Sequence, residues 1–236
     1  MKASFTPGGK SARGGSPLKS GLSDRNWAKT FSFSSGSVVQ VVESKGGPYA
    51  AGDYVTGFMS GAWRLYQVSN GQGMMKIEPK LGAPLGAYLG GLGMPGLTAW
   101  HGLLKIGKPK GGETVFVSAA SGAVGALVCQ IAKLQGCFVV GSAGSDEKCN
   151  WLKNEIGVDA TINYREAGDA LAKALAAAAP KGVDIYFENV GGAHLDAALA
   201  QMNPFGRIIA CGMISQYNMP DAAGIRNLGN VIGKRI

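Results

Sequence analysis

The segment Glu113–Lys148, ETVFVSAASGAVGALVCQIAKLQGCFVVGSAGSDEK, constrains the fold of this chain more than any other part of the sequence. A short apolar run, Thr114–Ala119, leads into a glycine-containing turn and then into a helical pattern of apolar residues. A second apolar run begins at Phe138. This order predicts a strand, a tight turn, a helix and a second strand, the unit in which a helix amino terminus faces the pyrophosphate of a dinucleotide.

The turn of this segment has the residues that such a site needs. Gly122 allows the backbone to approach a phosphate, and Gly125 allows the helix to pack closely on the strand. Ala119 stands where the first glycine of the GxGxxG pattern is usual. We therefore predict a dinucleotide site here; a glycine-rich crossover of a parallel sheet without a ligand is the alternative.

The end of the second strand bears on the choice of dinucleotide. An NAD site usually has an acidic residue there, which accepts hydrogen bonds from the ribose and repels a 2′-phosphate. This chain has small residues up to Ser145, which can donate a hydrogen bond, and Lys148 follows with a positive charge. Asp146 and Glu147 come later and are expected in the first turn of the next helix. The pattern favours NADP(H), unless Lys148 is only a solvated surface lysine.

Composition excludes several classes of function. No uninterrupted apolar stretch approaches the ~18–20 residues of a membrane-spanning helix. The net charge of +8 is concentrated at the amino terminus, where six basic residues and one acid fall within the first 35 positions. A basic patch for nucleic acid on the folded body is therefore not predicted. With two histidines, His101 and His194, far apart in the sequence, a metal site is not expected either.

The chain divides into three predicted parts. Residues 1–37 lack apolar periodicity and are expected to be a disordered or unrelated leader. Residues 38–105 contain short strand-like runs, such as Val38–Val42 and Tyr54–Phe58, and a helical stretch near Gly96–Leu104. Residues 106–236 alternate five strands with four helices, which predicts an α/β domain with a doubly wound parallel sheet. The predicted strands are Val115–Ala119, Phe138–Gly141, Ala160–Asn163, Val183–Glu188 and Arg207–Gly212, and the predicted helices are Val124–Gln135, Asp146–Ile156, Ala167–Ala178 and Leu195–Met202.

Several segments together resemble a known family. They are VVES with GDYVTG, LGMPGLTAWHGLL, ETVFVSAASGAVG, KGVDIYFENVGG and CGMISQYN. From about Val38 onward the chain is similar to the zinc-independent medium-chain dehydrogenase/reductases, specifically the NADP-dependent alkenal and prostaglandin/leukotriene reductases. The resemblance implies a Rossmann domain preceded by a partial all-β GroES-like domain, both shorter than in the family.

The resemblance also implies an activity and a set of site residues. NADPH would deliver a hydride to the C=C bond of an α,β-unsaturated aldehyde or ketone, and a hydroxyl donor would face the carbonyl oxygen. Tyr66 is the candidate donor, although a strand tyrosine that packs its ring is the alternative; Tyr217 fits a cofactor contact better. The implied cofactor-binding residues are Ser121, Gly122, Ala123, Val124, Gly125, Ser145, Lys148, Tyr164, Asn189, Cys211, Gly212, Met213, Ile214, Ser215, Gln216 and Tyr217.

A second class of function stays open at this stage. Compared with the family pattern, the chain is expected to lack the opening strands and the last strand, which would suit a catalytically impaired nucleotide-binding protein or an RNA- or partner-binding relative. A short-chain dehydrogenase is excluded, because neither Tyr164 nor Tyr186 is followed by lysine at the fourth position. We expect a small enal or enone substrate, pairing of two copies, and a cytoplasmic location, with organelle targeting by the basic amino terminus as the alternative.

Overall fold

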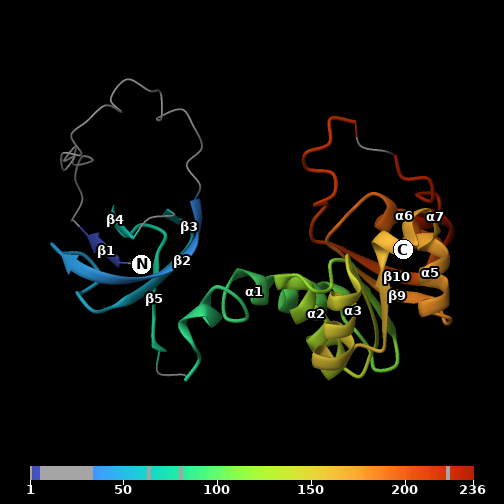
Figure 1. Ribbon diagram of the computed structural model, residues 1–236, viewed down its shortest axis with the longest axis horizontal. Coiled ribbons are helices and arrows are strands. Elements are labelled where there is room, and N and C mark those ends of the chain that lie inside the picture. The colour runs from blue at the N-terminus through green and yellow to red at the C-terminus, as the bar shows by residue number, and fades with distance from the viewer. Residues whose placement is uncertain (1, 6–33, 63–64, 80–81, 222–223) are drawn as a thin grey trace. The chain divides into compact units, whose positions relative to one another are not determined.

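The computed structural model describes residues 2–5, 34–62, 65–79, 82–221 and 224–236. The chain forms two compact units, Met1–Met94 and Pro95–Ile236, and each has its own five-stranded sheet (Figure 1). The division falls before the helical stretch that the sequence placed in the first domain. The assignment of residues 38–105 and 106–236 to separate domains stays a prediction.

The first unit contains a mixed sheet with the strand order β4-β1-β2-β3-β5. β2 pairs with β3 and β3 with β5 in antiparallel fashion, whereas β1 runs parallel to both of its neighbours. Val39, Val41 and Val55 are buried together with Met74 in a small core. The elements are β1 (Lys2–Phe5), β2 (Ser34–Ser44), β3 (Tyr54–Ala62), β4 (Tyr66–Ser69), β5 (Met75–Ile77) and the 3₁₀ helix η3 (Leu85–Tyr88).

Residues 1–37, which the sequence assigned to a disordered or unrelated leader, contribute regular structure at both ends of that segment. Lys2–Phe5 form β1, between β4 and β2 in the sheet, and β2 begins at Ser34. Backbone hydrogen bonds to neighbouring strands hold these residues, and such bonds do not require the apolar periodicity on which the prediction relied. Residues 6–33 lie outside the described part of the chain.

The second unit contains a parallel sheet with the order β10-β9-β6-β7-β8, as the α/β prediction required. From β6 the chain moves outward through β7 to β8, and it then returns to the other side of β6 for β9 and β10. The sheet is therefore doubly wound. Its strands are β6 (Thr114–Val117), β7 (Phe138–Ala143), β8 (Ala160–Asn163), β9 (Val183–Glu188) and β10 (Met202–Ala210).

Helices cover both faces of this sheet (Figure 1). Alternate residues of the central strands enter two separate cores, because successive side chains of a strand point to opposite faces. Val115 and Phe187 pack with α2 and η5 on one face, and Phe116 and Tyr186 pack with α5 and α6 on the other. The helices are α1 (Met94–Trp100), the π-helical η4 (His101–Gly107), α2 (Ala123–Leu134), α3 (Asp146–Trp151), the π-helical η5 (Leu152–Ile156), α4 (Tyr164–Ala167), the 3₁₀ helix η6 (Gly168–Ala170), α5 (Leu171–Ala178), α6 (Ala193–Gln201) and α7 (Asn230–Gly233).

Within the described residues, no helix is both long and apolar enough to cross a bilayer.

Candidate functional site

The candidate site lies where the strand order of the second sheet reverses. β6 has β7 on one side and β9 on the other, so the connections that leave β6 and β9 run to opposite sides. In open α/β sheets, ligands bind in the crevice at the carboxyl ends of two such strands. The turn after β6 begins at Ser118, and the turn after β9 begins at Asn189.

The turn after β6 has the backbone conformation of a phosphate-binding turn. Ala119 has a φ of 48°, in the left-handed region that favours glycine, which explains why glycine is usual at this position. A Cβ on Gly125 would collide with the carbonyl oxygen of Ala119 and would lie 2.8 Å from the Cα of Ala120. Gly125 therefore allows α2 to start directly against the turn that follows β6.

The amino terminus of α2 leaves backbone N–H groups for a ligand. The first N–H groups of any helix have no partner within the helix, and Gly122, the N-cap of α2, has no side chain to accept from them. The first turn, which includes Ala123 and Val124, also contains no acidic residue. A helix of 12 residues with such an end attracts an anion through its N–H groups and its dipole.

A hollow of about 450 Å³ continues this site beyond the end of β7. Two exposed cations, Lys148 and Arg165, line it, and within the described residues neither forms an ion pair. No acidic residue is part of the lining. The full lining is Ala119, Ser121, Gly122, Ala143, Gly144, Ser145, Lys148, Tyr164 and Arg165.

The acidic residues that follow β7 lie in α3 and not in the lining of the hollow, as the sequence predicted. Ser145 is the N-cap of α3, and its hydroxyl oxygen accepts the backbone N–H of Lys148 at 3.4 Å. Asp146 and Glu147 fall in the first turn of α3, where they suit the helix dipole. Asp146 also accepts the side-chain amide of Asn163 at 2.8 Å.

Tyr164 is positioned by two close neighbours. A Cβ on Gly144 would lie 2.9 Å from the Tyr164 hydroxyl oxygen, so the tyrosine ring rests against bare backbone there. The ring also packs against His194 in a T-shaped arrangement, with centroids 5.1 Å apart and planes at 73°. His194 Nε2 lies 2.8 Å from the hydroxyl oxygen of Ser142 in β7.

A buried polar cluster joins the two turns at the centre of the crevice. The hydroxyl oxygen of Ser118 accepts the backbone N–H of Asn189 at 2.9 Å, and the Asn189 amide donates to the Ser118 carbonyl at 2.8 Å. Within the described residues, Asn189 Oδ1 has no partner and is free for a ligand. Oε1 of Glu188 accepts the Tyr186 hydroxyl and the backbone N–H groups of Val190 and Gly191, at 2.7 to 2.9 Å.

The two oxygens of the Glu188 carboxylate differ in their hydrogen bonding. Glu188 is 2 % exposed, and within the described residues its Oε2 has no hydrogen-bond partner although Oε1 has several. Burial, and then the nearby Glu188 carboxylate, raise the pKa of Tyr186 well above its usual value, so Tyr186 stays a hydrogen-bond donor. The carboxylate therefore fixes the shape of the turn after β9 rather than facing solvent.

The loop after β10 is fastened onto that turn. The N–H groups of Cys211 and Gly212 donate to the Glu188 carbonyl, and Ile214 donates to the carbonyl of Asn189. The Ser215 hydroxyl donates to the Val190 carbonyl at 2.6 Å. This arrangement places residues 211–217, which the sequence assigned to the nicotinamide half of a cofactor, beside Asn189.

The Tyr217 hydroxyl accepts the N–H of Met213 at 2.9 Å, so this side chain closes the loop on itself. Burial, and then Glu188, raise the pKa of the Cys211 thiol, so it is not poised as a thiolate. The remaining predicted loop residues, Met213, Ile214 and Ser215, are exposed, and Gln216 is partly buried.

Tyr66 belongs to β4 of the first unit and is 63 % exposed. The catalytic role of Tyr66 stays a prediction.

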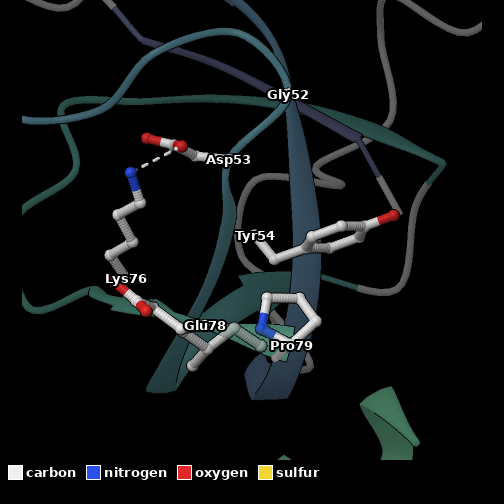
Figure 2. A pocket seen from close by; sticks show the side chains of 7 residues that line it. Gly52, Asp53, Tyr54, Lys76, Glu78 and Pro79 are labelled. Atoms are coloured by element: carbon white, nitrogen blue, oxygen red, sulfur yellow. Dashed lines mark ion pairs between the residues drawn. The ribbon is translucent and has the colours of Figure 1, made fainter. Parts of the chain in front are cut away.

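The first unit also has a small hollow of about 200 Å³, in which the Lys76 ammonium meets the Asp53 carboxylate at 2.7 Å (Figure 2). Asp53 also accepts the N–H of Ala50, and these two interactions, the backbone hydrogen bond first, lower the pKa of Asp53. The pair fixes the turn before β3. It shows none of the features of the nucleotide crevice.

Within the described residues, no group of three or more histidine, cysteine, aspartate or glutamate side chains is arranged to hold a metal ion. Zinc independence stays a prediction from the sequence.

Four residues of the site were missed at the level of sequence. Arg165 directly follows a predicted site residue, and its charge was a signal that the prediction did not use. Ser118 and His194 gave no usable signal, because their partners Asn189 and Ser142 are 71 and 52 positions away in the chain. Glu188 bonds mainly to residues two or three positions away, and nothing in the local sequence distinguished its carboxylate from that of any other acid at a strand end.

Comparison with known proteins agrees with this geometry. Residues 123–236 match the sequence model of the zinc-binding dehydrogenases. The chain is 52% identical over 200 residues to the NADP(+)-dependent 2-alkenal reductase of Nicotiana tabacum, covering 84% of this chain and 57% of the relative. It is 51% identical over 183 residues to prostaglandin reductase 1 of Bos taurus, covering 77% and 54%. The chain thus spans little more than half the length of these relatives.

Among solved structures, CurA from Vibrio vulnificus in complex with NADPH matches with a TM-score of 0.76 and 40% identity, over 85% of this chain and 60% of CurA. The doubly wound sheet, the glycine turn and these similarities together define a nucleotide-dependent dehydrogenase or reductase fold. It belongs to the medium-chain dehydrogenase/reductase family.

Proposed function

We propose that the second unit binds NADP(H) in the crevice between β6 and β9. The observation that carries this proposal is the hollow beside Ser145. It is lined by two cations that form no ion pair with any described residue, and its lining contains no acidic residue. A 2′-phosphate needs both conditions, because a carboxylate at the end of β7 would repel it. The activity named for the tobacco relative and the NADPH of the CurA structure support the same cofactor.

The residues present fit the proposed cofactor along its length. The N–H groups at the start of α2 would hold the pyrophosphate, and Gly122 leaves them uncovered. Lys148, Arg165 and Tyr164 would surround the 2′-phosphate, with two positive charges and a phenol hydroxyl. Asn189 and the loop 211–217 would hold the nicotinamide half.

We further propose that the protein takes part in NADPH-dependent reduction of the C=C bond of α,β-unsaturated aldehydes and ketones. The nicotinamide would supply the hydride for that reduction. On the protein's side, the main requirement is a hydrogen-bond donor at the substrate's carbonyl oxygen, where negative charge develops in the transition state. Tyr66 is the candidate donor. The names of the tobacco and bovine relatives support this substrate class.

Titration of the purified chain with NADPH and NADH, followed by nicotinamide fluorescence, tests the cofactor assignment. We expect NADPH to bind more tightly. Lys148→Ala should weaken NADPH about tenfold and leave NADH unchanged, because a charge pair near the surface contributes roughly 1–4 kcal/mol. Lys153→Ala, which removes an exposed cation outside the hollow, is the matched control. Equal affinity for the two cofactors would contradict the proposal.

Turnover of NADPH with a 2-alkenal tests the activity. Tyr66→Phe should lower kcat and leave the dissociation constant of NADPH unchanged, because the hydroxyl acts on the substrate alone. Tight NADPH binding without turnover would favour the alternative of a catalytically impaired nucleotide-binding protein. A cytoplasmic location and the pairing of two copies are further proposals, which cell fractionation and size-exclusion chromatography test.

A further inference from the structure

His194 is a buried residue of α6 and is not part of the lining of the hollow, so it is outside the set of residues that would touch the cofactor. It is 4% exposed and lies in the first turn of α6, directly after the turn that Glu188 shapes. Its backbone N–H donates to the Gly191 carbonyl at 3.2 Å. The side chain points to the other end of the site, where it contacts Ser142 and Tyr164.

We propose that His194 is a positioning residue for cofactor selection, which holds the Tyr164 ring in place as one wall of the 2′-phosphate pocket. The inference rests on the proposed NADP(H) function. The Tyr164 ring packs against the His194 ring, and its hydroxyl end lies against the bare backbone of Gly144. A tyrosine with both of these contacts keeps its hydroxyl in one place beside Lys148 and Arg165.

Ser142 fixes the histidine in turn. Its hydroxyl is fully buried in β7 and lies 2.8 Å from Nε2, so the imidazole plane cannot rotate without breaking a buried hydrogen bond. β7 is also the strand whose end forms the floor of the hollow, through Ala143 and Gly144. Ser142, His194 and Tyr164 therefore connect the strand, the helix α6 and the pocket wall in a single chain of contacts.

This role makes a prediction that a merely structural role does not. Loss of the histidine ring frees Tyr164 and weakens only ligands that carry a 2′-phosphate. A general loss of folding would weaken all nucleotides alike. The same selective effect should follow from Gly144→Ala, because the three atoms nearest to the new Cβ all belong to Tyr164 and the tyrosine ring would be displaced.

The test measures dissociation constants of NADPH, NADH, 2′,5′-ADP and 5′-ADP for the full chain, with circular dichroism as the check on folding. For His194→Ala and Gly144→Ala we expect NADPH and 2′,5′-ADP to weaken at least fivefold, with NADH and 5′-ADP within twofold of wild type. The double variant Ser142→Ala with His194→Phe retains a ring beside Tyr164 and leaves no unpaired hydroxyl, so it should keep the preference for the 2′-phosphate.

The outcomes separate the two proposals. If wild type prefers NADPH and both single variants keep that preference, or lose affinity for all four ligands equally, the positioning role is overturned while the cofactor assignment stands. If His194→Ala does not fold, the double variant decides, and loss of the 2′-phosphate preference in a folded double variant would overturn the positioning role. If wild type does not distinguish 2′,5′-ADP from 5′-ADP, the NADP(H) function fails, and the role of His194 fails with it.

Discussion

Acidification should destabilise the second unit through His194. Burial lowers the pKa of this histidine from 6.5 to about 4. Above about pH 6.5 the imidazole is neutral in both the folded and the unfolded chain, so it does not affect stability there. Between about pH 6.5 and pH 4 the unfolded chain takes up a proton that the folded chain excludes. The free energy of unfolding must therefore fall as the pH falls through this range.

The size of the effect follows from the two pKa values. A difference of one pKa unit corresponds to about 1.4 kcal/mol once the pH is below both values. For His194 the loss should reach about 2 kcal/mol between pH 7 and pH 5, and about 3 kcal/mol at pH 4. This is a large part of the ~5–15 kcal/mol that typically stabilises a domain.

Urea unfolding of wild type and His194→Gln at about pH 7, 6 and 5 measures this loss. Glutamine can still hydrogen-bond to Ser142 and does not titrate. Carboxylates affect both proteins equally, so the difference between the two free energies isolates the histidine. We expect wild type to lose about 2 kcal/mol more than the variant between about pH 7 and pH 5. Parallel loss in the two proteins would refute the reasoning.

Three further predictions concern the crevice. Ala119→Gly should raise the free energy of unfolding by roughly 0.5–1 kcal/mol. The substitution removes the strain of an alanine in the left-handed region, and this gain exceeds the entropy that glycine adds to the unfolded chain. A lower urea midpoint would contradict this. Glu188→Ala should cost roughly 2–4 kcal/mol, since it leaves the Tyr186 hydroxyl and the N–H groups of Val190 and Gly191 without their acceptor. Glu188→Gln, which keeps one acceptor oxygen, should cost about half as much in the same urea experiment, and equal costs would show that these bonds are not the cause. Arg165→Ala should weaken NADPH about tenfold at low salt and less at high salt, because solvent ions screen an exposed charge; a loss independent of salt would show that the charge is not responsible.

Much of the second unit could be predicted from local sequence. The strands Ala160–Asn163 and Val183–Glu188 have the predicted bounds, and the predicted helix Asp146–Ile156 is present as α3 followed by η5. These elements depend on short apolar runs, helix caps and glycines, whose effects extend over only a few residues. Where the pairing is irregular, prediction was less accurate. β10 begins at Met202, five residues earlier than expected, and its register shifts before Arg207.

The sequence by itself determined that a glycine turn follows β6, that no acid ends β7, and that Lys148 is near that end. Each of these facts depends on residues close together in the chain. Only the tertiary structure brought Arg165 to the same hollow, placed His194 against Ser142 and Tyr164, and joined Ser118 to Asn189. These contacts connect residues that are far apart in the sequence, because parallel strands align their carboxyl ends only after the intervening helices have packed on the sheet. The local sequence of the turn after β6 therefore predicts a nucleotide site, whereas the proposed preference of that site for a 2′-phosphate depends on contacts that form on folding.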